Sequence, residues 1–142
     1  MKVKISKKIY IILVTLAVLF IGCGRVSYPP EWGKRLQYKG SNLFYVSGII
    51  EKQARKLGEY LVKNGFFQEG NRGTVQIAKQ GDTYHFRMVV KEGMDKDMEF
   101  IKTAGIFAAT MSRDVFEGKN VEMHLCDPQL KTLQVVGFKI KE

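Results

Sequence analysis

The sequence predicts an α+β domain in which an antiparallel sheet of about five strands packs against two helices on one face. Segments with apolar residues at helical spacing are separated by segments in which apolar and polar residues alternate, as in half-buried strands. Their order is β-α-β-β-α-β-β, which suits a sheet covered by helices on one side. The chain has 142 residues, of which 45% are hydrophobic and 26% charged. This composition favours one globular domain and argues against a disordered chain or a multi-span membrane protein.

The first strand and the first helix are expected just after Asn42. The aromatic run at 43–46 is typical of a strand, and residues 48–64 follow as a helix. Asn64 and Gly65 are expected to end that helix with a left-handed cap. Its apolar face has four members at helical spacing, Ile50, Ala54, Leu57 and Leu61.

A β-hairpin is expected next, because residues 75–77 and 84–90 alternate around the turn residues Gly81 and Asp82. The chain is expected to end in a second hairpin of strands at 121–125 and 133–138. Each hairpin follows a helix and a glycine, so the sequence suggests two α-β-β units related by a pseudo-twofold axis.

The second helix is expected over 95–116, with acidic residues at its amino end, where the helix dipole favours them. Its middle, 103–112, has no charged residue, which indicates burial on more than one side. Small residues in this part allow another element to approach closely. They pack either on the domain's own sheet or in a dimer or partner interface, and they are Ala104, Gly105, Ala108 and Ala109.

The amino-terminal segment has the pattern of an export signal. Four lysines in the first eight residues precede an uncharged run at 9–21, which is shorter than the ~20 residues that cross a bilayer. The run ends in Gly22-Cys23-Gly24, which resembles the lipobox of bacterial lipoproteins. The resemblance implies cleavage between Gly22 and Cys23 and attachment of acyl chains to Cys23. An ordinary secretory signal cut after Gly24 and an uncleaved short anchor are the alternatives.

These boundaries predict three parts: a signal peptide at 1–22, a lipidated Cys23 with a basic and aromatic tether at 23–41, and a single domain at 42–142. Because Gly24 stands where Asp favours inner-membrane retention of lipoproteins, we expect the periplasmic side of the outer membrane. A bacterium with one membrane would display the protein on the outer face of that membrane. Trp32 is expected either at the membrane interface or packed on the edge of the domain.

The sequence contains no phosphate-binding glycine loop, nucleophile elbow or HExxH motif. Glu122, His124 and Cys126 alternate along one expected strand and therefore share a face, where His85 could join them. His85, His124 and Cys126 are thus weak candidates for an activated thiolate or a Zn²⁺ or Cu²⁺ site. The simpler interpretation is polar residues on a half-exposed sheet, and no cofactor or metal is expected. Cys126 is expected to be a free thiol.

From Ala54 to about Val136 the chain also resembles small uncharacterised bacterial envelope proteins. The segments that carry this resemblance are 57–61, 65–67, 81–84 and 86–90. The resemblance supports the extent of the domain and implies no activity.

Together these observations predict a lipid-anchored envelope protein with a non-enzymatic binding or assembly domain. Its open sheet face and strand edges are expected to bind a protein partner or a second copy of the chain. Nucleic acid is not an expected partner of an exported protein, although the whole chain has a net charge of +9. The alternative is an envelope enzyme or a binder of metal or small ligands that uses His85, His124 and Cys126.

Overall fold

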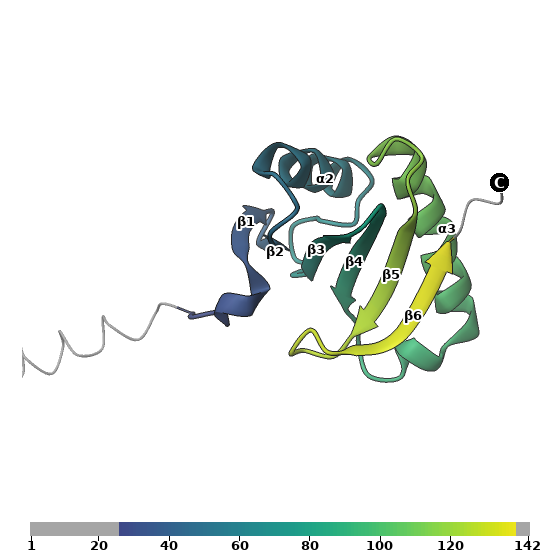
Figure 1. Cartoon of the computed structure of the whole chain (residues 1–142). Coiled ribbons are helices and arrows are strands. Elements are labelled where there is room, and N and C mark those ends of the chain that lie inside the picture. Colours follow the sequence, from purple (N-terminus) through teal and green to yellow (C-terminus); the bar gives the residue numbers. More distant parts are fainter. Residues whose placement is uncertain (1–25, 139–142) are drawn as a thin grey trace, which may run out of the picture.

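The computed structural model describes residues 26–138, which form one six-stranded sheet and two α-helices (Figure 1). The strands follow one another across the sheet in sequence order. They are β1 (Lys34–Tyr38), β2 (Ser41–Tyr45), β3 (Thr74–Gln80), β4 (Thr83–Val89), β5 (Val121–Cys126) and β6 (Thr132–Phe138). The helices are α2 (Glu51–Lys63) and α3 (Met98–Asp114), and short 3-10 turns lie at Pro30–Trp32 and Met94–Lys96.

The sheet is mixed, so the expected antiparallel sheet of about five strands is wrong in strand number and partly wrong in pairing. Three antiparallel hairpins, β1–β2, β3–β4 and β5–β6, are joined through two parallel pairs, β2–β3 and β4–β5. Each parallel pair is connected through a helix, which returns the chain to the end of the sheet where the previous strand began. The expected pseudo-twofold axis is also absent from the described sheet. Such an axis would reverse the strand order of the second α-β-β unit and place β6 beside β4, whereas the observed order is sequential and places β5 there.

β1 is a strand that the sequence pattern does not predict, and it lies within the expected tether. It pairs with β2 from Lys34 opposite Tyr45 to Tyr38 opposite Ser41. The two residues between the strands, Lys39 and Gly40, have φ angles of 52° and 81°. Positive φ at both positions is typical of the tightest hairpin turns, which match the twist of the strands. The sequence signal was weak because lysine replaces the usual Asn or Asp at the first position.

Both helices pack on the same face of the sheet, as expected. Leu57 and Leu61 of α2 and Ala108 and Met111 of α3 belong to one buried cluster with the inward-facing strand residues. These strand residues are Leu43, Tyr45, Val75, Ile77, Phe86, Met123 and Leu125. α2 contacts β1 and β2, whereas α3 contacts β5 and β6. Among residues 26–138, the opposite face of the sheet carries no α-helix, only the 3-10 turn Pro30–Trp32 (Figure 1).

Helix α3 starts later and ends earlier than the spacing predicted. The first residues of the expected helix, Asp95 and Lys96, belong instead to the 3-10 turn Met94–Lys96. Asp97 then caps α3, because its Oδ1 accepts a hydrogen bond from the Phe100 amide at 3.1 Å. Of the small residues in its middle, Ala104 and Ala108 are buried in the core. The close approach that they permit is therefore used by the domain's own sheet.

Candidate functional site

The sheet face opposite the helices carries a row of polar side chains on neighbouring strands. Gln76 on β3 lies opposite Arg87 on β4, and Arg87 lies opposite His124 on β5. Residues directly opposite each other in a sheet project from the same face. The three side chains therefore line up across the middle of the face that has no α-helix.

The segment before β1 covers one end of this face. Tyr28 and Trp32 pack edge-on against Phe44 of β2, with ring centroids 5.0 and 5.2 Å from it. The Gln76 side chain donates a hydrogen bond to the Trp32 carbonyl at 3.0 Å. Trp32 therefore packs on the edge of the domain, which is one of its two expected positions.

Arg87 connects the covered end of the face to the open end. Its Nη2 donates to the Leu130 carbonyl at 2.8 Å and to the Thr132 hydroxyl at 3.2 Å. Its Nη1 lies 3.4 Å from the Gln76 side-chain oxygen. The Nε atom is buried without a hydrogen-bond partner. The guanidinium thus holds the loop before β6 down on the sheet.

At the open end, His85, Glu122 and His124 form a compact cluster. The Glu122 Oε2 lies 3.8 Å from the His85 Nε2 and 3.4 Å from the His124 Nε2. The two imidazoles stack with ring centroids 5.0 Å apart. One potential ligand atom from each residue lies within 4.8 Å of the others. All three side chains are partly exposed, so a solvent molecule has access to the cluster.

Thr132 and Glu122 flank the His124 ring and orient its two nitrogens. Its Nδ1 lies 3.1 Å from the Thr132 hydroxyl, which leaves the Nε2 directed toward Glu122. Burial, and secondarily the nearby His85, lowers the pKa of His124 below its ordinary value of 6.5. His124 is therefore neutral near pH 7, and one ring nitrogen carries a lone pair.

Cys126 does not belong to this cluster. Its side chain is completely buried at the end of β5. Its Sγ lies 4.0 Å from the Thr132 hydroxyl. Burial raises the pKa of the Cys126 thiol above its ordinary value of 9.0, with Arg87 opposing the shift. The thiol is free and buried, which is the opposite of an activated nucleophile.

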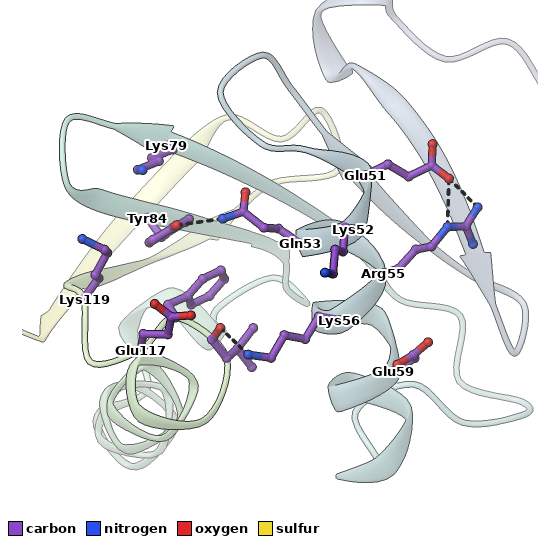
Figure 2. Close-up of a pocket in the computed structure, with 12 residues that line it drawn as sticks. Glu51, Lys52, Gln53, Arg55, Lys56, Glu59, Lys79, Tyr84, Glu117 and Lys119 are labelled. Carbon is purple, nitrogen blue, oxygen red and sulfur yellow. Dashed lines mark hydrogen bonds and ion pairs between the residues drawn. The ribbon is translucent and has the colours of Figure 1, made fainter.

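A groove lies between the polar face of α2 and the chain that leaves α3 (Figure 2). Its volume is about 830 Å³. Its charged groups are partly engaged, since Arg55 pairs with Glu51 and Lys56 donates to the Val115 carbonyl at 3.2 Å. Gln53 donates to the Tyr84 hydroxyl at 3.2 Å. No histidine or cysteine lines the groove. It is a hollow of mixed charge on the described domain and holds no set of ligands for a transition metal.

The sequence-predicted residues are therefore partly brought together. The His85 and His124 rings lie side by side. The third potential metal ligand beside them is Glu122, and not Cys126, which was the third candidate. Ala104 and Ala108 are buried, Gly105 lies under the Val136 side chain, and only Ala109 lines a surface hollow. Gly22 and Cys23 lie outside the described residues.

A family model described as the AF_1994_N family N-terminal domain matches residues 35–137. The chain belongs to this family. The match runs from β1 to β6, so the family's domain includes the strand that was expected in the tether and all residues of the cluster. The family name states the position of the domain and no activity. No curated protein and no solved structure shows significant similarity to the chain.

Within the described part of the chain, neither helix has both the length and the apolar character of a membrane span.

Proposed function

We propose that this protein is a lipid-anchored component of the bacterial cell envelope whose single α+β domain is a non-enzymatic binding module. The observation that carries the anchor is Cys23, preceded by Gly22 at the end of an uncharged run that follows four lysines. Two or three acyl chains at one cysteine give stable attachment, because each buried methylene contributes ~0.8 kcal/mol. In a bacterium with two membranes we propose the periplasmic side of the outer membrane.

The packing of the segment before β1 supports a domain held close to the membrane. Tyr28 is fixed against Phe44, and its hydroxyl accepts a hydrogen bond from the Asn42 side chain at 3.2 Å. Only five residue steps separate Cys23 from Tyr28, and an extended chain covers at most about 18 Å over that distance. A domain anchored through Cys23 would therefore lie beside the bilayer. Its nearest potential partners there are other proteins of the envelope.

The outer edge of β6, with which no other strand of residues 26–138 pairs, supports a binding role. β6 ends the sheet, its seven residues from Thr132 to Phe138 carry no charge, and Leu133 and Val135 are 47% and 45% exposed. The opposite edge strand, β1, begins with Lys34 and Arg35, and charged side chains of this kind discourage strand addition. We therefore propose that an extended segment of a protein partner adds to the β6 edge.

Intact mass spectrometry of the membrane-extracted protein tests the anchor. The expected chain starts at Cys23 and carries the added mass of a diacylglyceryl group and an N-linked acyl chain. Cys23→Ser removes that added mass, and Cys126→Ser is the matched control that keeps it. A chain that starts at Arg25 without lipid would refute the anchor.

Site-specific photo-crosslinking in the native envelope tests the β6 edge. A photoreactive residue at Gln134 on β6 is expected to give a defined adduct, whereas the same residue at the exposed Gln37 on β1 gives none. Leu133→Lys is expected to abolish the adduct, because a charge on the edge opposes strand pairing. An adduct with the protein itself identifies a homodimer as the partner. No adduct, or equal adducts from both edges, would refute the proposed edge.

A further inference from the structure

We propose that His85, Glu122 and His124 bind one divalent transition-metal ion, with Zn²⁺ and Cu²⁺ as the matching class. This site goes beyond the proposed anchor and partner and does not depend on them. Two imidazoles and a carboxylate are a known ligand set for a Zn²⁺ ion that keeps a further position for water. Imidazole nitrogen favours Zn²⁺, Cu²⁺ and related ions, whereas Ca²⁺ and Mg²⁺ favour sites made of oxygen ligands.

The distances within the cluster suit an ion better than direct hydrogen bonds. A hydrogen bond between an imidazole and a carboxylate is typically about 2.7–2.9 Å long. Both Nε2 atoms instead lie farther from the same Glu122 oxygen, at 3.4 Å from His124 and 3.8 Å from His85. Ligands bound at ~2.0–2.1 Å around a tetrahedral ion are about 3.3–3.4 Å apart. The ligand atoms of all three residues lie within 4.8 Å of one another, so side-chain rotations that draw them together would place them around one ion.

The residues behind His124 orient it as a ligand. Thr132 receives a hydrogen bond from Arg87 at 3.2 Å and lies 3.1 Å from the His124 Nδ1. A hydroxyl oxygen accepts two hydrogen bonds, so it can also accept the Nδ1 proton. This tautomer leaves the Nε2 lone pair free on the side of Glu122. Hydrogen bonding of the second ring nitrogen is the usual support of a histidine ligand.

The smallest side chains of the sheet flank the cluster and keep it open. Along its row, Ala78 lies opposite His85, His85 opposite Glu122, and Glu122 opposite Gly137. A Cβ atom added to Gly137 would meet nothing within 4 Å. The space beside Glu122 is thus free on the β6 side. A bound ion has room there for water or for an external ligand at its remaining position.

Zn²⁺ titration of the full chain tests the site. The protein is expressed without a histidine tag, extracted in detergent, stripped with a chelator and titrated with Zn²⁺ alone in a calorimeter. One Zn²⁺ per chain is expected. His85→Ala, His124→Ala and Glu122→Gln are each expected to weaken binding about tenfold or more, which is at least the effect of losing an outer partner of a ligand. Thr132→Val is expected to weaken binding to a smaller extent.

Cys126→Ser is the matched control, and it is expected to leave Zn²⁺ affinity unchanged. With Co²⁺ in place of Zn²⁺, the spectrum should lack a sulfur-to-cobalt charge-transfer band. Far-ultraviolet circular dichroism of the metal-free variants verifies that they are folded, and Glu122→Gln alters the fewest packing contacts. No binding by the wild type beyond that of the His85→Ala, His124→Ala double variant would overturn the proposal. Loss of binding in Cys126→Ser would overturn it as well.

Discussion

A substitution at Gly58, in the middle of α2, tests whether β1 packs against this helix. Gly58 is buried, and a Cβ built on it would fall 2.7 Å from the Tyr38 hydroxyl oxygen and closer still to the ring carbons. Tyr38 is the last residue of β1, and its ring stacks on Phe67 with centroids 6.2 Å apart. The glycine thus creates the space in which a strand residue packs on the helix.

Two opposing effects determine the outcome of Gly58→Ala. Alanine in a helix interior is favoured over glycine by ~0.8–1.0 kcal/mol. Displacing the Tyr38 ring is an overpacking change, which typically costs about 1–3 kcal/mol. We therefore expect Gly58→Ala to lower the free energy of unfolding by about 1 kcal/mol. In a Tyr38→Ala background the clash is absent, and the same change should raise stability by about 1 kcal/mol.

Urea unfolding followed by circular dichroism, on the wild type, both single variants and the double variant, measures this difference. The coupling between Gly58 and Tyr38 is expected to be about 2 kcal/mol, well above the additivity error of ~0.5 kcal/mol. Equal stabilisation by Gly58→Ala in both backgrounds would refute the reasoning. It would mean that Tyr38 does not lie on α2 and that residues 34–38 behave as the tether that their sequence first suggested.

Three further predictions concern single residues. Asp97→Ala should lower the free energy of unfolding by ~1 kcal/mol in urea unfolding, because it removes the hydrogen bond to the Phe100 amide, and an unchanged midpoint would contradict this cap. Both Gly33 and Gly81 have a positive φ, at 88° and 58°, but a Cβ added to Gly33 would collide with the Tyr45 carbonyl, whereas a Cβ added to Gly81 would meet nothing within 4 Å. Gly33→Ala should therefore unfold the protein at a much lower temperature than Gly81→Ala, and equal melting temperatures would contradict this. Because burial raises the pKa of the Cys126 thiol, iodoacetamide at pH 8 should modify Cys126 slowly in the folded Cys23→Ser variant and rapidly in guanidinium; rapid modification without denaturant would show that the thiol is exposed.

Both helices could be predicted from the sequence because their signals are local. Leu57 and Leu61 recur at helical spacing, and both are completely buried in the structure. The strand at Lys34–Tyr38 could not be recognised in this way, since its inward residues Leu36 and Tyr38 are only partly buried and charges surround them. Its place in the fold depends on a two-residue turn with positive φ at Lys39, which few lysines adopt.

The candidate site was predictable in part. Alternation along β5 places Glu122 and His124 on one face from sequence alone. His85 comes close to Glu122 and His124 only because β4 and β5 pair in parallel, with His85 opposite Glu122. No local pattern specifies that register, because the connection between the two strands passes through the whole of α3.

The sequence by itself therefore determined the helices, the hairpins at 74–89 and 121–138 and the inward-facing residues of β3, β4 and β5, because those features follow from periodicity along the chain. The tertiary structure alone decided three matters: that β1 joins the sheet, that β4 and β5 run parallel, and that Cys126 is buried while Glu122 stands beside both histidines. The last two depend on which distant segments pack together, and the first depends on the turn at Lys39 and on the packing of Tyr38 against α2. The pairing of distant strands is determined by the burial of the core that they share beneath α2 and α3, and not by the properties of any one segment.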